Sequence, residues 1–476
     1  MVRSLRAPVA LGSALAASIA PVRDVLITDT MSGEKRPVQP NGEGVVGIYA
    51  CGPTTYGPIH IGNARPYVIP ILLQRFLVRE GYDARVVINV TDVNDKIYAA
   101  AAERGIPSAQ HAEEMIAAYV ADTDALGIGR PDHEPKATET IGPIVALIEA
   151  LVDSGHAYES GGDVYFSVRS FDRYGALSNR DPEQMDQGEE AGAADLKEDP
   201  LDFALWKARK GGEDTFWPSP WGDGRPGWHI ECSAMAEELL GLEFSIHGGG
   251  SDLVFPHHEN EVAQTEAARG RPLARIWMHN GMVQAGAEQK MSKSLGNIFL
   301  LGEAIEAFGA EAVVRFLVSG HYRQPIAFGE EELRQAAAAN QRIREFFRDG
   351  GEDGGEQAAE VVERMDAFLD ALADDFNTPR ALAELSTLIA AARADAGGLP
   401  GARDAVREML RLLGLQSLAA SEDVAVPPEA VALLVERGEA RERRDWARAD
   451  EIRDELAALG FEVRDEAGGA RLIAKR

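Results

Sequence analysis

The stretch that decides the fold is VVGIYACGPTTYGPIHIGNARPYVIPI, residues 45–71. It opens with an apolar run, residues 45–50, which has the length and composition of a buried strand. Residues 51–57 are rich in turn formers, and a helix-like apolar pattern begins at HIGN, residues 60–63. The stretch therefore predicts a strand, a turn and a helix, as in an α/β protein with a parallel sheet.

The predicted helix has one apolar face and a plausible stop at Gly81. The residues on that face are Ile69, Leu72, Leu73, Phe76 and Leu77. A helix N-terminus presents unpaired N–H groups and partial positive charge, so His60 and Asn63 are predicted to lie where phosphate oxygens bind. Pro70 removes a hydrogen bond inside the pattern, so we expect a bent or irregular helix.

A second segment far along the chain, KMSKS at residues 290–294, is basic and flanked by Gly286 and Gly296. Positioned cations stabilise the charge that develops on a transferred or leaving phosphate. A loop with this composition is therefore suited to bind pyrophosphate. Taken alone, each of the two segments is weak: HIGN arises by chance in many proteins, and KMSKS is commonly a solvated loop.

Together, in this order and in a chain with Rossmann-like patterning, the two segments resemble the signature sequences of class I aminoacyl-tRNA synthetases. The resemblance implies that His60, Asn63, Lys290 and Lys293 are catalytic. It also implies that ATP, carried with Mg²⁺, is bound by His60, Gly62, Asn63 and above all Lys293. Asn63 stands where a second histidine is commoner, and Gly57 where an aspartate is frequent, so we expect tuned rather than lost activity.

The bulk composition fits a large soluble protein. The 476 residues leave room for about three domains. Lys and Arg number 48 against 77 Asp and Glu, a net charge of −29, which is unusual for a nucleic-acid binder. Residues 436–476 are nearly neutral, with 10 basic and 11 acidic residues. There is no uncharged apolar span long enough for a membrane helix, so no membrane partner is predicted.

Residues 1–23 contain three arginines, no acids and an Ala-rich apolar stretch, and are interpreted as a disordered or presequence-like extension. ATP and tRNA are not available outside the cell, so secretion is disfavoured and a cytoplasmic protein is expected. If the extension is a transit peptide, the protein belongs instead in an organellar matrix. An upstream misassignment of the start codon is the third interpretation.

Cys51 and Cys232 are the only cysteines, which is typical of a reducing compartment rather than a disulfide scaffold. In FPHHENE, His257 and Glu261 are spaced i and i+4 and share one helical face. Two thiolates, an imidazole and a carboxylate make a tetrahedral zinc set. Isolated cysteines are commonly buried hydrophobes and such a His/Glu pair is commonly a surface contact, so spacing alone leaves both interpretations open.

Several stretches carry a closer resemblance, to cysteinyl-tRNA synthetases, over nearly the whole chain from about residue 24. They are CGPT at residues 51–54, GWHIECSAM at 227–235, HGGGSDL at 247–253 and FPHHENE at 255–261. The resemblance implies one Zn²⁺ per subunit and gives its ligands as Cys51, Cys232, His257 and Glu261. It further implies substrate-binding roles for Thr91, Trp228, His247 and Asp252. Without the resemblance, two other interpretations stay open. Trp228 can be a residue of the hydrophobic core, and Thr91 or Asp252 can cap a helix.

The zinc explains how cysteine can be chosen over serine. A soft thiolate bonds zinc far better than a hydroxyl does, whereas shape alone hardly separates sulfur from oxygen. No editing domain is then needed. The insertion at about residues 96–226 would serve chiefly the acceptor end of tRNA.

The predicted organisation is a Rossmann-type catalytic domain at residues 24–300, interrupted by that insertion. The second half of this domain is predicted to hold strands near residues 244–247 and 276–283 with a helix between them. The insertion is predicted to be helical at first and strand-like around residues 163–168, with an exposed acidic loop at 181–199. A helical stem-contact region follows at 301–349, then a helical bundle at 350–426 that begins with a GGEDGG linker, and a small anticodon-binding domain at 427–476. The last domain is predicted to hold one charged helix, about 440–459, and a hairpin turning at Gly468-Gly469. Its candidate tRNA contacts are Arg443, Arg444 and Trp446, with Arg441, Arg448 and Arg453 on the same helix.

The sequence thus predicts a monomeric cysteine–tRNA ligase that joins L-cysteine to tRNA(Cys) with ATP. One alternative is a ligase that shares the catalytic domain but couples cysteine to an aminosugar; such enzymes generally lack a full tRNA-binding tail. Another is a noncatalytic synthetase paralogue acting as a binding module. Both signature segments and the tail favour the synthetase.

Overall fold

The computed structural model describes residues 23–181, 196–285, 289–290, 299–348, 357–395, 399–420, 427–466 and 469–474. The chain divides into two compact units, and the boundary along the sequence lies between residues 419 and 420. Residues 1–22 of the predicted extension at 1–23, the GGEDGG linker, and residues 182–195 of the predicted acidic loop lie outside the described residues. Within the described part, no helix combines the length and the apolarity needed to cross a membrane.

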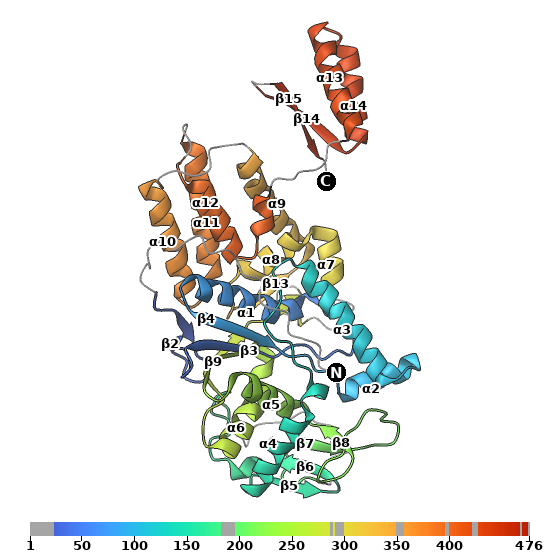
Figure 1. Ribbon diagram of the computed structural model, residues 1–476, viewed down its shortest axis with the longest axis vertical. Coiled ribbons are helices and arrows are strands. Elements are labelled where there is room, and N and C mark those ends of the chain that lie inside the picture. The colour runs from blue at the N-terminus through green and yellow to red at the C-terminus, as the bar shows by residue number, and fades with distance from the viewer. Residues whose placement is uncertain are drawn as a thin grey trace. The chain divides into compact units, whose positions relative to one another are not determined.

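The centre of the first unit is a four-stranded parallel sheet (Figure 1). Its strands, in sheet order, are β10 (Ala274–Asn280), β9 (Phe244–Gly250), β3 (Val45–Ala50) and β4 (Asp83–Ile88). Successive residues point to opposite faces, so Ile48 and Val86 join the core under α1 (Ile61–Arg79), whereas Tyr49 and Val87 join a core on the other face. The second core is completed by α5 (Trp228–Leu240) and α6 (Glu259–Arg269). Covering both faces is what allows an all-parallel sheet, and the predicted α/β class is confirmed.

Helix α1 is continuous through both of its prolines, Pro66 and Pro70. A proline inside a helix costs about 3 kcal/mol. Here the helix is buried along most of its length, against the sheet on one side and later helices on the other. Apolar burial at roughly 25 cal/mol per Å² outweighs that cost, so neither proline ends the helix.

The predicted strand at residues 276–283 is in fact two strands, and this part of the prediction is wrong. β10 ends at Asn280, and β11 (Val283–Ala285) belongs to a separate small sheet with β12 (Gln289–Lys290) and β13 (Ile326–Phe328). The chain leaves the central sheet at Gly281, which packs against the backbone of Gln324. A Cβ at position 281 would lie 2.3 Å from the Gln324 carbonyl oxygen, so only glycine fits.

The insertion starts with helices and then forms its own antiparallel sheet, in the order β5-β6-β7-β8, as predicted in outline. Its sheet packs on α4 through buried residues such as Ile148, Phe203 and Trp206. The elements are α2 (Asp95–Arg104), α3 (Ser108–Ala125), η1 (Ala137–Glu139), α4 (Ile141–Asp153), β5 (Ala157–Ser160), β6 (Asp163–Phe166), η2 (Val168–Ser170), β7 (Phe203–Ala208) and β8 (Gly224–Pro226).

After the sheet the first unit is a bundle of helices. Its elements are α7 (Leu301–Phe308), α8 (Ala310–Ser319), α9 (Glu330–Arg348), α10 (Ala359–Ala373), α11 (Thr378–Ala394), α12 (Ala402–Leu412) and η8 (Gln416–Ala419). Buried side chains of these helices join those of α1 in one continuous core. A short hairpin, β1 (Leu26–Thr28) with β2 (Lys35–Pro37), precedes the sheet.

Asp375 ties this hairpin to the bundle. Its buried carboxylate accepts hydrogen bonds from Thr28 N at 2.8 Å, Thr28 Oγ1 at 2.7 Å and Tyr322 Oη at 2.7 Å. Its backbone is left-handed, with φ of 62°, a conformation that aspartate tolerates better than most residues.

We predict that Asp375→Ala lowers the free energy of unfolding by about 3 kcal/mol, because buried donors lose their acceptor and alanine is strained at this φ. Urea unfolding of the purified variant measures the loss. The matched control is Asp374→Ala, which removes only a half-exposed ion pair with Lys35 and should cost under about 1 kcal/mol. Equal losses in the two variants would contradict the prediction.

The second unit contains two helices where one was predicted. They are α13 (Pro428–Glu442) and α14 (Trp446–Ala458), followed by the antiparallel hairpin β14 (Phe461–Glu466) and β15 (Gly469–Ala474). The hairpin was predicted, although Gly468 of its turn lies outside the described residues. Arg444 breaks the helical run with a φ of 59°, and the Asp445 side chain then caps α14 by accepting from Arg448 N. Ala430, Ile452, Leu456 and Phe461 form the unit's own small core.

Candidate active site and metal centre

Backbone hydrogen bonds join residues 299–301, which follow the KMSKS segment in the chain, to the backbone at the HIGN segment. Ile61 N donates to Phe299 O at 3.0 Å, and Leu301 N donates to Ile59 O at 3.0 Å. The chain that follows KMSKS therefore runs beside HIGN. Lys290 is described only through its backbone, and Lys293 lies outside the described residues.

The N-terminus of α1 suits an anionic ligand. Its first turn carries no acidic residue. Asn63 Oδ1 accepts a hydrogen bond from the backbone N–H of His60 at 3.1 Å. The amide oxygen of Asn63 thus closes the turn, and its Nδ2 is the donor side of the group. The helix N-terminus adds partial positive charge at the same place.

The predicted site residues follow the carboxyl ends of adjacent parallel strands. Cys51 follows β3, Thr91 comes shortly after β4, and Asp252 follows β9 within η5 (Ser251–Leu253). Parallel strands end at one edge of a sheet, which is where ligands bind in this class of fold. Topology alone therefore gathers residues that are distant in sequence.

A buried cluster of metal-binding side chains lies at this edge. Cys51 Sγ is 3.5 Å from His257 Nε2 and 3.5 Å from Glu261 Oε1, and the last two atoms are 3.1 Å apart. His257 belongs to the short turn η6 (Val254–His258), and Glu261 lies in the first turn of α6. A tetrahedral zinc with bonds of about 2.0–2.3 Å separates its ligand atoms by roughly 3.3–3.8 Å. The donor set and its spacing therefore fit a metal ion.

Two further side chains compete for the fourth position. Cys232, from α5, is buried and lies close enough to Cys51 and His257 to raise the pKa of both groups. His258 was not singled out from the sequence, yet its Nε2 is 3.3 Å from Cys51 Sγ. The ligand atoms that lie within 4.8 Å of one another are those of Cys51, His257, His258 and Glu261.

Neighbouring side chains orient the cluster as they do around bound metals. His229 Nδ1 is 3.0 Å from His257 Nδ1, and burial lowers the pKa of His229 well below its usual value. A neutral His229 can accept the Nδ1 proton of His257, which leaves His257 Nε2 unprotonated toward the cluster. His247 Nε2 lies 2.9 Å from Glu261 Oε2, and His258 Nδ1 lies 2.7 Å from His279 Nε2.

The pKa values of the two thiols are shifted in opposite directions. Burial and the adjacent Cys232 raise the pKa of Cys51 well above its usual range. The hydrogen bond with Cys51, with help from the charge of His257, lowers the pKa of Cys232 to about 6 despite its burial. The two adjacent thiols therefore favour a state in which only one of them is a thiolate.

Two of the four predicted substrate contacts, Trp228 and His247, touch side chains of this cluster. Trp228, which is 37% exposed, stacks on His257 with ring centroids 4.5 Å apart. His247 supports Glu261, and Asp252 contributes to raising the pKa of His257 after the larger effects of Cys232 and Glu261. Thr91 is buried, and its Oγ1 donates to Glu231 Oε2 at 3.1 Å.

Sequence reasoning missed Glu231 and His258. Glu231 is fully buried beside Cys232, its Oε1 has no hydrogen-bond partner among the described residues, and burial raises its pKa well above the usual value. Both residues stand inside stretches already singled out, GWHIECSAM and FPHHENE. The signal was present in the motifs, but residue spacing did not say which members face the site.

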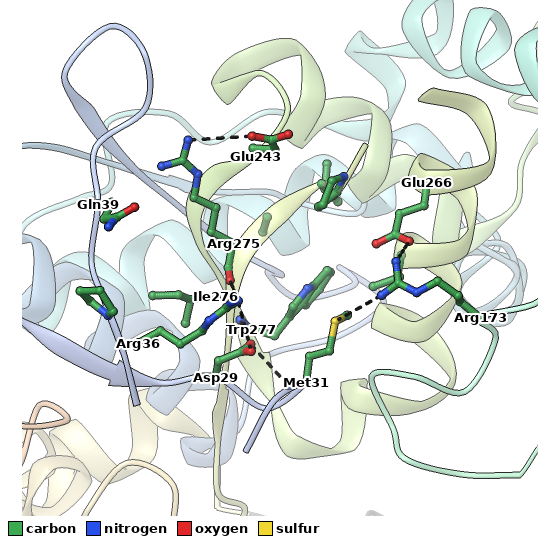
Figure 2. Close-up of a pocket in the computed structure, with 15 residues that line it drawn as sticks. Asp29, Met31, Arg36, Gln39, Arg173, Glu243, Glu266, Arg275, Ile276 and Trp277 are labelled. Atoms are coloured by element: carbon green, nitrogen blue, oxygen red, sulfur yellow. Dashed lines mark hydrogen bonds and ion pairs between the residues drawn. The ribbon is translucent and has the colours of Figure 1, made fainter. Parts of the chain in front are cut away.

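A separate cavity of about 530 Å³ has Trp277 and several charged side chains in its lining (Figure 2). Trp277 lines it and also stacks on His247, with centroids 4.4 Å apart. The charged side chains that line the cavity form ion pairs with one another. Arg173 pairs with Glu266, and Arg275 pairs with Glu243. Of the predicted catalytic residues whose side chains are described, neither His60 nor Asn63 lines it, so we do not place the reaction there.

In the second unit the predicted tRNA contacts lie around the break between the helices. Arg443, Arg444 and Trp446 are exposed, and Trp446 is 58% exposed as the first residue of α14. Arg448 is less suited to phosphate, because its guanidinium is occupied by Glu436, Glu451 and Glu455.

Three family models match the chain. One for the class I (C) tRNA synthetase catalytic domain matches residues 37–338, one for the DALR domain 367–417, and one for the cysteinyl-tRNA ligase anticodon binding domain 423–471. Cysteine–tRNA ligase of Geobacter sulfurreducens is 44% identical over 93% of this chain and 98% of the relative. That of Halorhodospira halophila is 44% identical over 94% and 98%.

Among solved structures, methionyl-tRNA synthetase of Mycobacterium tuberculosis bound by methionyl-adenylate has a TM-score of 0.57 at 18% identity, covering 85% of this chain and 96% of the other. At that identity the likeness concerns the fold. The family models and the relatives, which span almost the whole chain, decide the rest: the chain belongs to the cysteine–tRNA ligase family of class I aminoacyl-tRNA synthetases.

Proposed function

We propose that the protein charges tRNA(Cys) with L-cysteine in two steps. The cysteine carboxylate attacks the α-phosphorus of ATP, and the bond to the departing pyrophosphate breaks. A terminal ribose hydroxyl of the tRNA then attacks the carbonyl of the adenylate, and AMP leaves. The observation that carries the proposal is the buried thiol, imidazole and carboxylate cluster at the sheet edge that also presents the HIGN helix N-terminus.

The protein's contribution to both steps is positioning and charge stabilisation, and no covalent enzyme intermediate is needed. His60, Gly62 and Asn63 bind ATP phosphates at the N-terminus of α1, and Lys290 and Lys293 neutralise the leaving pyrophosphate. Magnesium bound with ATP supplies further positive charge at the phosphates. Thr91, Trp228, His247 and Asp252 enclose the amino acid.

We assign the metal ligands to Cys51, Cys232, His257 and Glu261, with His258 as a support that holds the sulfur of Cys51. A zinc ion held there would ligate the substrate thiol and so distinguish cysteine from serine. Support comes from the spacing of the cluster, from its hydrogen-bonded imidazoles, and from the second thiol on α5. Metal content of the purified protein, by mass spectrometry, tests the assignment.

The test of the reaction is cysteine-dependent exchange of pyrophosphate into ATP, followed by transfer of labelled cysteine to tRNA. Exchange and charging are both expected. Absence of exchange would overturn the proposal, and exchange without charging would favour the aminosugar ligase. The match of residues 423–471 to an anticodon-binding model argues against that alternative.

We further propose that Arg443, Arg444 and Trp446 contact the tRNA. Stacking of a base on an aromatic side chain is worth about 1–3 kcal/mol, so Trp446→Ala should raise the KM for tRNA roughly 10-fold or more. Pyrophosphate exchange should not change, because Trp446 lies in the second unit. Trp446→Phe keeps a stacking surface and is the matched control. An unchanged KM in the alanine variant would remove Trp446 from the interface.

The protein is proposed to act as a monomer in the cytoplasm. A cytoplasmic protein has ATP, tRNA and reducing conditions that keep both thiols available for metal. Light scattering during chromatography measures the oligomeric state.

A further inference from the structure

Arg65 is a buried cation that the reaction as described does not use. It lies in α1, two residues after HIGN, and its exposed fraction is 0%. Among the described residues, no carboxylate forms an ion pair with it. Burial of this kind is costly, and it lowers the pKa of Arg65 to about 10.

Four backbone carbonyls take the place of a carboxylate. Arg65 Nη1 donates to Gly281 O and to Gln324 O, both at 2.6 Å. Arg65 Nη2 donates to His321 O at 2.9 Å and to Gly320 O at 3.3 Å. The last two carbonyls directly follow α8, whose C-terminal end adds partial negative charge. The guanidinium thus holds two separate loops, residues 281–282 and 320–324.

Both loops are shaped to approach each other closely. Gly281 N donates to Tyr322 O at 2.7 Å, and Ile326 N donates to Met282 O at 3.0 Å. Besides Gly281, Gly320 also lacks room for a side chain, because a Cβ there would lie 2.6 Å from Ile326 Cγ2. The two loops and Arg65 therefore form one tightly packed joint.

The joint determines where β11 begins. β11 pairs in parallel with β13, with Val283 opposite Ile326, and antiparallel with β12, with Gln284 opposite Lys290. β11 also lies against the HIGN turn, since a Cβ at Gly62 would be 3.7 Å from Val283 Cβ. The backbone of Lys290 is thereby placed relative to the N-terminus of α1.

We propose that Arg65 is a positioning residue for adenylate formation. It fixes β11, and with it the Lys290 backbone, beside the HIGN turn. A hydrophobic residue would fill the same space at lower electrostatic cost, but it would not hold four carbonyls in one geometry. The inference rests on the proposed function, because the geometry matters only if ATP reacts between these segments.

The test uses the full-length Arg65→Lys variant, which keeps the charge but cannot reach all four carbonyls. Small misplacements of reacting groups are costly, so kcat for pyrophosphate exchange per active site should fall about 10-fold or more. Active sites are counted from the burst of adenylate, which separates slow catalysis from partial unfolding. The KM for cysteine and the zinc content should stay within about 2-fold of wild type, since Arg65 does not contact the metal cluster.

Arg75→Met is the matched control. Arg75 lies on the same helix and donates to the carbonyl of Arg411 at 2.8 Å, but it faces the bundle. Its loss should lower stability and leave kcat per active site unchanged. Gly281→Ala is a second variant, which forces the joint apart with Arg65 intact, and it should reproduce the defect in kcat.

Hydrogen exchange gives a readout independent of activity. Amides of residues 281–285 should exchange at least about 10-fold faster in Arg65→Lys and should be unchanged in Arg75→Met. Unchanged protection, or a normal kcat per active site in both Arg65→Lys and Gly281→Ala, would overturn the inference. A wild-type protein that shows no cysteine-dependent exchange would instead overturn the proposed function, whatever the protection of β11.

Discussion

Cys232→Ser should lose most of the bound zinc and lower kcat/KM for cysteine at least about 100-fold, since changes to residues that merely support metal ligands already cost 10–100-fold. A hydroxyl is a hard, weakly acidic ligand, so it cannot replace a thiolate on zinc. The fold should survive, because serine has nearly the same shape as cysteine and Cys232 is one of many buried residues of α5. Metal analysis, exchange kinetics with cysteine and serine, and a melting curve measure the three expectations.

His258→Asn is the decisive companion variant, because His258 Nε2 also lies beside Cys51. If Cys232 is the fourth ligand, His258→Asn should keep its zinc. Removing a supporting imidazole should then lower the affinity for zinc only moderately. If His258→Asn loses the metal while Cys232→Ser keeps it, the assignment is reversed. The ratio of kcat/KM for cysteine to kcat/KM for serine should also fall only in the variant that removes the true ligand.

Lys293→Ala should slow formation of the adenylate by about 10²–10³-fold in a single turnover, the range typical of deleting one group that stabilises charge in a transition state. The reason is the charge that grows on the leaving pyrophosphate. Binding of cysteine should change little, because the proposed amino-acid site is the metal cluster together with Trp228, which stacks on His257. Rapid quenching with labelled ATP measures the step.

Lys293→Arg is the control for charge, and it should retain more of the rate than alanine does. A normal single-turnover rate in Lys293→Ala would remove Lys293 from catalysis. A raised KM for cysteine with a normal rate would point to a defect in amino-acid binding instead.

Much of the catalytic domain was predictable because its signals are local. Residues 45–50 form β3 with the predicted limits, and α1 starts directly after His60. The i,i+4 spacing of His257 and Glu261 predicted that both side chains lie on one side of the chain. In the structure His257 Nε2 is 3.1 Å from Glu261 Oε1. Such features depend on periodicity and on chain stiffness, which a sequence displays directly.

The features that the sequence did not predict depend on contacts between distant residues. The split between β10 and β11 depends on Gly281 meeting Gln324, and the break in the last helix depends on Arg444 adopting a left-handed backbone. The role of His258 depends on its distance from Cys51 across the sheet edge. Each is decided by a partner far away in sequence or by packing that outweighs local preference.

The sequence by itself determined the reaction class, through the resemblance of HIGN and KMSKS to class I signatures, and the amino acid, through the resemblance of CGPT, GWHIECSAM, HGGGSDL and FPHHENE to cysteinyl-tRNA synthetases. Both inferences depend on the identity of residues along the chain. Only the tertiary structure decided which side chains meet. It gathers strand ends at one edge, adds His258 to the thiols of Cys51 and Cys232, and holds two loops on the carbonyl-bound Arg65. These contacts arise because parallel strands end together and because buried polar groups must find partners wherever the fold supplies them.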